Sequence, residues 1–293
     1  MRLPKFEYLR PTSLDEALDL LNEYKGRARL IAGGTALLVP MKRGILTPQY
    51  LISLNNIPHL DGLHVENRIL KLGARCTIST IETHPIIKER WRILAQAAKS
   101  IGSVQIRNVA TVGGNICSAV PSADMVPSLI TLGAKVVLVS KAGKRTLPLE
   151  DFFKGVGEVD LKESEVLTEI QIPELPPKSG GGYLKFSRRK AMDLPIVGVA
   201  AIVSLDESNS TCRGLKVALG AVAPTPFKIK GIEKLAMGRE LDDDLIDKIS
   251  EKASWQINPN PRSFRSSVEY RREMVKVLTR RILKEARSLA KQN

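Results

Sequence analysis

The order of apolar and polar residues predicts a chain in which helices and strands are mixed. Ser13 and Glu16 have the spacing of a capping box, and apolar residues recur every three or four positions behind them, so we expect a helix from about 13 to 24. Further apolar runs predict strands at 29–32, 50–54, 69–74, 135–140, 196–205 and 215–222, and helices at 35–41, at 93–101 and over most of the chain after 242.

A segment rich in proline and glycine, from 172 to 182, is the clearest internal boundary. Three prolines and three glycines in eleven residues are typical of a linker or a mobile loop. The chain shows no internal repeat. Its 293 residues are enough for one large domain or two ordinary ones with a sizeable core.

The chain is basic, with 45 Lys and Arg against 31 Asp and Glu, which raises nucleic acid as a partner. Residues 262–293 carry ten Lys and Arg against three Glu, and their apolar residues recur at helical spacing. An amphipathic terminal helix with a solvated basic face explains this charge without nucleic acid. Aromatic residues are only 4% and do not alternate with basic ones. We therefore expect no nucleic-acid binding; the basic helix is either simply solvated or a docking face for an acidic protein.

The cysteines and histidines do not indicate a metal site. Cys76, Cys117 and Cys212 are scattered, so they are expected to be buried thiols in a reducing compartment, and they are too few for an iron–sulfur cluster on this chain alone. No pair of the three histidines has the spacing of a helical zinc site. The sequence contains no run of eighteen uncharged apolar residues, which argues against a membrane span, and residues 1–7 do not resemble a signal peptide. We expect a cytoplasmic protein.

Two glycine turns are the candidate ligand-binding features. Gly33-Gly34-Thr35 and Gly113-Gly114-Asn115 each stand beside a predicted helix or strand. Glycine lets the backbone approach a ligand closely, and consecutive amides at such a turn can hold a phosphate. Either turn alone is better explained as a plain tight turn. Neither G-x-G-x-x-G nor G-x-x-x-x-G-K-[ST] occurs, so these residues by themselves suggest only a two-loop phosphate grip.

A resemblance to a known family goes further. The sequence resembles the FAD-binding medium subunit of heterotrimeric molybdenum hydroxylases, the group of aerobic carbon monoxide dehydrogenase, glyceraldehyde oxidoreductase, nicotinate and quinoline dehydrogenases and the flavin domain of xanthine dehydrogenase. The resemblance runs nearly end to end, in the family's order. It rests on Phe6-x-Tyr8-x-Arg10-Pro11, Ala17-x-x-Leu20-Leu21, Ala32-Gly33-Gly34-Thr35-Ala36-Leu37-Leu38, Gln105-Ile106-Arg107-Asn108, Thr111-Val112-Gly113-Gly114-Asn115, Pro121-Ser122-Ala123-Asp124, Tyr183-x-Lys185, Arg188-Arg189-x-x-x-Asp193 and Glu269-Tyr270-Arg271-Arg272.

The resemblance implies an α+β fold. It predicts an FAD-binding domain of the vanillyl-alcohol-oxidase type over 1–175, made of two α+β subdomains that divide near 55–60. A smaller α+β domain of the carbon monoxide dehydrogenase flavoprotein type is expected over 176–293. The proline- and glycine-rich segment falls where the family has this boundary.

The resemblance also assigns cofactor-binding residues, and it implies no catalytic residue and no metal ligand on this chain. The cofactor-binding residues that it assigns are Ala32, Gly33, Gly34, Thr35, Ala36 and Leu37 in a first pyrophosphate loop, Thr111, Gly113, Gly114 and Asn115 in a second, and Ile101, Ser122, Asp124, Leu167 and Lys185 elsewhere around FAD. Without it, Ile101 and Leu167 read as core residues, Lys185 as a solvated surface charge and Asp124 as a helix cap.

The implied function is electron transfer. In the family a large subunit carries the molybdenum cofactor, a small subunit carries two [2Fe-2S] clusters, and FAD on the medium subunit passes electrons to an external acceptor. This implies a heterotrimer or a dimer of heterotrimers. The positive charge of Lys185 would favour anionic reduced flavin, so its removal should lower the flavin midpoint potential.

Two features of the sequence depart from particular branches of the family. Leu194 stands where carbon monoxide dehydrogenases tend to have an aromatic residue, which argues against carbon monoxide as substrate, and the chain lacks the four cysteines of the 4-hydroxybenzoyl-CoA reductase branch. Two alternatives stay open: a scaffold subunit that has lost flavin, and a stand-alone flavin oxidase. The intact glycines disfavour the first, and nothing in the sequence suggests the substrate pocket or covalent flavin tether of the second.

Overall fold

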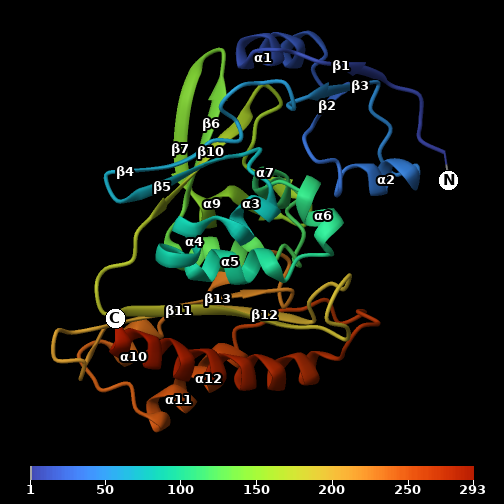
Figure 1. The fold of residues 1–293 in the computed structure, drawn as a ribbon. Helices are drawn as coiled ribbons and strands as arrows, with labels where there is room; N and C mark the ends of the chain where they lie inside the picture. Colours follow the sequence, from blue (N-terminus) through green and yellow to red (C-terminus); the bar gives the residue numbers. More distant parts are fainter. Residues whose placement is uncertain (1) are drawn as a thin grey trace.

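Three β-sheets of three to five strands, one two-stranded sheet and the helices between them organise the chain. The computed structural model describes residues 2–293. From one end to the other, a small sheet with α1, a five-stranded sheet, a layer of short helices, a four-stranded sheet and a final helical layer follow one another (Figure 1). The mixed α+β prediction is confirmed.

The first sheet is parallel and has the order β1-β3-β2. Ser13 caps the following helix, since its hydroxyl accepts the amide of Glu16 at 3.1 Å, while the Glu16 carboxylate accepts the amide of Thr12 at 2.7 Å. The predicted helix is confirmed, with its cap, and packs its apolar face on the sheet. The elements are β1 (Glu7–Leu9), α1 (Leu14–Glu23), β2 (Ala28–Ile31), α2 (Leu38–Lys42) and β3 (Tyr50–Ser53).

The second sheet is antiparallel, in the order β4-β5-β10-β6-β7, and short helices cover one face of it. Its strands are β4 (Leu63–Glu66), β5 (Ile69–Gly73), β6 (Lys135–Ser140), β7 (Gly143–Pro148) and β10 (Val166–Pro173). The other elements are α3 (Ile78–Thr83), α4 (Pro85–Arg90), α5 (Arg92–Lys99), α6 (Val104–Val109), α7 (Val112–Cys117), α8 (Met125–Leu132), α9 (Leu149–Phe152), β8 (Phe153–Gly155) and β9 (Glu158–Val159).

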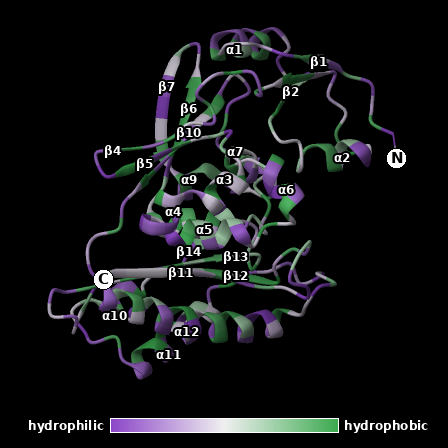
Figure 2. Ribbon diagram, viewed as in Figure 1, coloured by the Kyte–Doolittle hydropathy of each residue, from purple (hydrophilic) through white to green (hydrophobic). Residues whose placement is uncertain are grey.

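The third sheet is antiparallel and is buried on both faces. Along β12 alternate residues such as Val199 and Ala200 join different apolar cores, one shared with α5 and α8 and one with the last helices. Figure 2 shows β12 and β13 mainly in the apolar colour, and both polar and apolar positions along α12. The elements are β11 (Ser179–Phe186), β12 (Val197–Leu205), β13 (Cys212–Gly220), β14 (Phe227–Lys228), α10 (Glu233–Ala236), α11 (Asp243–Ser254) and α12 (Val268–Gln292).

The segment expected to be a linker is one only in part, because strands occupy both of its ends. β10 runs to Pro173, and the glycines lie in the first half of β11. A Cβ on Gly180 would lie 2.2 Å from the carbonyl oxygen of Ala286, because α12 crosses β11 at this point. Glycine therefore serves close helix–strand packing here rather than mobility. Only 174–178 connects the two strands, and the division at 175/176 stays a prediction.

The basic terminal helix is confirmed, but much of its charge is neutralised within the chain. One face of α12 packs on β11 and β12, and another lies along α11. Lys284 and Arg287 of α12 both pair with Asp243 of α11, at 2.5 and 3.1 Å. Arg280 pairs with Asp247 at 2.8 Å. Carboxylates of α11, in the same chain, therefore pair with basic residues for which the sequence suggested an acidic protein partner. None of the helices described over 2–293 is long and apolar enough to cross a membrane.

Candidate functional site

The first glycine loop lies against the residues that lead into the second. The loop over 32–37 connects β2 to α2, and Gly33 abuts the end of α6 so closely that a Cβ there would lie 1.8 Å from the carbonyl oxygen of Val109. The second loop begins at Thr111, two residues further on. The structure therefore brings together the two glycine turns that the sequence singled out.

The first loop presents a row of free backbone donors. Within residues 2–293, the amides of 33–37 donate to no protein acceptor, and the next internal bond runs from the amide of Leu38 to the carbonyl of Gly34 at 2.9 Å. Gly34 has a φ of +70°, which glycine adopts without strain. Consecutive free amides of this kind can bind an anion.

The second loop does not offer the free backbone amides that a two-loop phosphate site would need. Its amides are already used: Val112 donates to Cys76, Gly113 to Ala74 at 2.8 Å, and Gly114 to the Thr111 hydroxyl at 3.1 Å. The reason is that α7 begins directly after Thr111, which caps it, and docks on the residues that follow β5. A Cβ on Gly113 would lie 2.6 Å from the Ala74 carbonyl oxygen, so this glycine serves packing. What the second loop leaves free is the side chain of Asn115, whose Oδ1 is buried without a hydrogen-bond partner.

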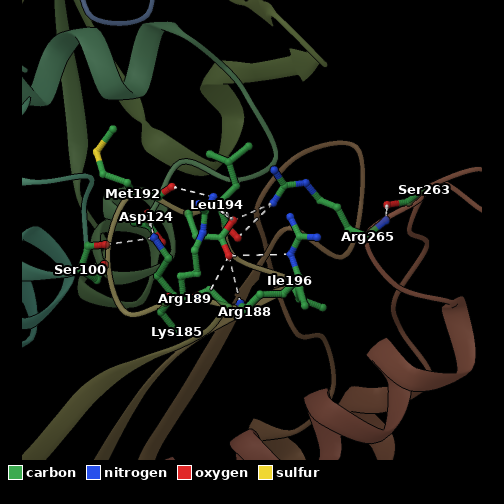
Figure 3. Close-up of polar contacts among 12 residues, drawn as sticks. Ser100, Asp124, Lys185, Arg188, Arg189, Met192, Leu194, Ile196, Ser263 and Arg265 are labelled. Carbon is green, nitrogen blue, oxygen red and sulfur yellow. Dashed lines mark hydrogen bonds and ion pairs between the residues drawn. The ribbon is translucent and has the colours of Figure 1, made fainter.

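A buried polar cluster joins the helical layer to β11. The carboxylate of Asp124 accepts a hydrogen bond from the Tyr183 hydroxyl at 2.7 Å. It accepts another from Lys185 Nζ at 2.9 Å, and the same Nζ donates to the carbonyl of Ser100 at 3.0 Å (Figure 3). The side chains of Asp124 and Lys185 are only 7% and 10% exposed. Burial raises the pKa of Asp124, although Lys185 and Tyr183 favour its charged form.

This cluster overturns two structural readings of the sequence. Asp124 holds the N-cap position of α8, but its side chain makes no capping hydrogen bond and turns to β11 instead. Lys185 is not a solvated surface charge, since it is largely buried and ion-paired. Tyr183 was matched in the sequence but given no role. It shares one face of β11 with Lys185, because residues two apart on a strand point the same way. That spacing is the signal that could have identified it.

The segment 100–102 is fixed by bonds to three parts of the chain. Lys185 holds the carbonyl of Ser100, Arg107 Nη1 holds that of Ile101 at 2.9 Å, and the amide of Met192 donates to Gly102 at 3.1 Å. The Ile101 side chain is 9% exposed and belongs to the apolar core, as the core reading predicted. This segment borders the polar cluster and is held rigidly beside it.

The remaining predicted residues lie in ordinary surroundings. Leu167 is 4% exposed, pairs with Leu138 across β10 and β6, and belongs to the same core as Ile101. Ser122 is half-buried and precedes α8. Ala32, Thr35 and Leu37 are half-buried within the first loop, and Ala36 is exposed. No group of three or more metal-ligating side chains is close enough to hold a metal ion in the described part of the chain.

Comparison with known proteins places the chain in a family. Residues 4–175 match the FAD-binding domain of molybdopterin dehydrogenases, and residues 182–286 match the C-terminal domain of carbon monoxide dehydrogenase flavoproteins. The glyceraldehyde dehydrogenase medium chain of Sulfolobus acidocaldarius is 35% identical over 96% of this chain and 98% of its own. A putative xanthine dehydrogenase FAD-binding subunit of Escherichia coli is 32% identical over 95% of each chain.

Solved structures agree. Carbon monoxide dehydrogenase from Hydrogenophaga pseudoflava superposes with a TM-score of 0.94 at 32% identity, covering 98% of each chain. Quinoline 2-oxidoreductase from Pseudomonas putida superposes with a TM-score of 0.92 at 29% identity and covers 99% of each. The chain thus belongs to the FAD-binding medium subunits of the molybdenum hydroxylases, and it is an oxidoreductase subunit whose cofactor is FAD.

Proposed function

We propose that this subunit transfers electrons within a heterotrimeric molybdenum hydroxylase. Electrons from the [2Fe-2S] clusters of a small subunit pass through FAD on this chain to an external acceptor, while a large subunit carries the molybdenum cofactor. The carrying observation is the row of five free amides at 33–37, beside a second loop in a chain of this family. Such amides suit the pyrophosphate of a dinucleotide cofactor.

The residues present fit FAD. The amides of 33–37 would hold the pyrophosphate, and Ala32, Thr35, Ala36 and Leu37 shape the loop that presents them. Asn115, with its unpaired buried Oδ1, would accept a hydrogen bond from a donor group elsewhere on the cofactor, and Thr111, Gly113 and Gly114 would hold it in place through the start of α7. An orphaned buried acceptor is uncommon in a folded protein, and a ligand donor would satisfy it.

The ring end of the cofactor belongs, in this proposal, beside the cluster of Asp124 and Lys185, with Ile101, Ser122 and Leu167 around it. FAD supplies the exchange between one-electron donors and a two-electron acceptor. The chain's contribution is electrostatic: Lys185 places a positive charge that Asp124 partly offsets, and Tyr183 and Ser100 fix both in position. No general acid, base or nucleophile on this chain is needed for that role.

The scaffold alternative is less well supported. The five amides of 33–37 bond to no acceptor of the protein, as a loop that binds the cofactor's pyrophosphate requires, and a scaffold role alone gives no reason for this arrangement. We also propose a domain division at 175/176 and a subdomain division near 55–60, because members of this family are divided in this way. The small first sheet ends at Ser53 and the next begins at Leu63. In this proposal the large subunit determines the substrate, and the assembly is a heterotrimer or a dimer of heterotrimers.

The electron route is tested on the assembled complex, prepared with and without FAD. We expect substrate to bleach the iron–sulfur absorption in both preparations, and reduction of an artificial two-electron acceptor only with FAD present. Added FAD should restore acceptor reduction. If the flavin-free complex reduced the acceptor at the rate of the complete one, the proposed route would be wrong.

A further inference from the structure

Exposed apolar side chains gather on two segments that contact each other. Met192 and Leu194, on the loop after β11, are 57% and 49% exposed, and Phe264, on the segment before α12, is 89% exposed. Arg265 Nη1 donates to the carbonyl of Leu194 at 3.2 Å and so joins the two segments. Figure 3 shows Met192, Leu194 and Arg265 on the same side of the molecule as Lys185. Large apolar side chains that are exposed as a group, rather than singly, indicate a surface that binds another molecule.

Positive charge surrounds these apolar residues. Segments 187–194 and 261–266 together carry four arginines and one lysine but a single carboxylate, that of Asp193. The Asp193 side chain is only 2% exposed, whereas those of Arg188 and Arg189 are 53% and 67% exposed. The surface of these two segments, here named the basic apolar face, therefore presents one sign of charge to solvent. Such a surface attracts and steers partners of the opposite charge.

The backbone of the basic apolar face is held in place from within the chain. The Asp193 carboxylate accepts the amides of Arg188 at 3.0 Å and Arg189 at 3.2 Å, and Arg265 pairs with it at 3.5 Å. The amide of Met192 donates to the carbonyl of Gly102 at 3.1 Å. Little ordering of the backbone is thus left for a partner to impose.

The composition of the face favours a protein partner over a lipid surface. Protein interfaces are enriched in arginine, methionine and aromatic residues and depleted in lysine. The basic apolar face has four arginines to one lysine, with Met192 and Phe264 among its exposed apolar residues. Peripheral binding to anionic lipid typically uses an amphipathic helix, and neither 187–194 nor 261–266 is helical.

We propose that the basic apolar face docks a small acidic electron-carrier protein, which is the external acceptor of the flavin's electrons. This inference rests on the proposed electron route. Lys185, beside which the flavin ring is proposed to lie, is on the strand that leads directly into 187–194, so a docked carrier lies near the ring. Two carriers each accept one electron from reduced flavin, FADH⁻, which returns to FAD and releases one proton to solvent. Redox partners of this kind need only a small interface.

The test uses the assembled complex with FAD bound and photoreduced without excess reductant. The probe is the soluble domain of cytochrome b5, an acidic protein that accepts one electron. Stopped-flow absorption of its haem should show second-order reduction that slows steeply as salt is added, because salt screens the attraction between the two surfaces. A small neutral quinone, which needs no docking face, should be reduced at a rate that salt hardly changes.

Variants assign the docking to this face. Arg189→Gln/Arg262→Gln should reduce cytochrome b5 at least fivefold more slowly at low salt, and Phe264→Ser should slow it without changing the salt dependence. The matched control, Arg213→Gln/Arg281→Gln, removes two exposed arginines elsewhere and should keep the parent rate. All three should reduce the quinone as the parent does, since none changes the proposed flavin site.

Three results would overturn the inference: equal losses in the arginine variant and its control, equally fast reduction of the basic protein cytochrome c at low salt, or parent-like cytochrome b5 reduction by a variant that no longer binds phosphatidylserine vesicles. The last result would assign the face to a lipid surface. Reduction of the quinone with slow, salt-independent reduction of cytochrome b5 would refute this inference alone. Failure to reduce either acceptor would refute the electron route, and the inference with it.

Discussion

Gly33→Ala is the sharpest perturbation of the proposed pyrophosphate loop. The new Cβ would lie 1.8 Å from the carbonyl oxygen of Val109, and real Cβ atoms stay at least 3.0 Å from such atoms, so one side must move by at least 1.2 Å. Ala110, next to Val109, is held on both sides, donating to Ile106 at 2.8 Å and accepting from Ile78 at 2.9 Å. The loop over 33–37 donates none of its amides to the protein and is held only where the carbonyls of Gly34 and Leu37 accept the amides of Leu38 and Met41, so the loop is the part that shifts.

A shift of this size exceeds the tolerance of a hydrogen bond, whose donor–acceptor distances span only about 0.5 Å. Hydrogen bonds to charged groups contribute about 1.5–3 kcal/mol each. The loss of one or two to the pyrophosphate predicts a rise in the FAD dissociation constant of about tenfold to 10⁴-fold, with about a hundredfold as the central expectation.

The assay is titration of FAD into flavin-free protein, followed by flavin fluorescence, with thermal unfolding recorded alongside. Gly44→Ala is the matched control: it follows α2, has a φ of +70° and meets no atom within 4 Å of its new Cβ. It should cost some stability and leave FAD affinity unchanged. A folded Gly33→Ala protein that binds FAD within threefold of the parent would refute the assignment of this loop.

Three other predictions follow from the buried groups. Asp124→Asn should raise the flavin midpoint potential and Lys185→Met should lower it, because they remove opposite charges from one pair; shifts in the same direction would contradict the electrostatic role. Gly180→Val should lower the free energy of unfolding by about 3 kcal/mol or more in guanidinium titrations, since its Cβ would lie 2.2 Å from an α12 carbonyl. Gly214→Ala, in ordinary contact at 3.5 Å, is its control and should cost far less. Burial raises the pKa of Cys76 to about 12, so at pH 8 the thiol is protonated and iodoacetamide should label its peptide only after unfolding; rapid labelling of the native protein would refute this.

The sequence correctly predicted the helices and strands that depend on interactions between neighbouring residues. The capping box at Ser13 gave the right start for α1, and the β-branched run at 135–140 gave β6 with its observed limits. The short helices of the middle layer were largely missed, because six-residue helices such as α6 and α7 are too short to show periodicity and depend on tertiary packing.

The errors at the site have the same origin. Gly180 carries no mark that distinguishes a flexible glycine from one on which a helix packs, since the helix comes a hundred residues later. Asp124 has the local pattern of a helix cap, but the donors on β11 that capture its side chain are about sixty residues away. The glycine turns were located correctly, whereas their different uses were not. That difference depends on whether α7 has already taken the amides of its own loop.

The most direct test of the account is the flavin content of the purified, full-length subunit. Its visible absorption spectrum would be recorded, and the cofactor released by denaturation would be identified by chromatography. The account predicts one FAD per chain, either as purified or after FAD is added to freshly folded protein. Folded protein that binds no FAD, alone or in the assembled complex, would contradict the reading of the two loops and support the scaffold alternative.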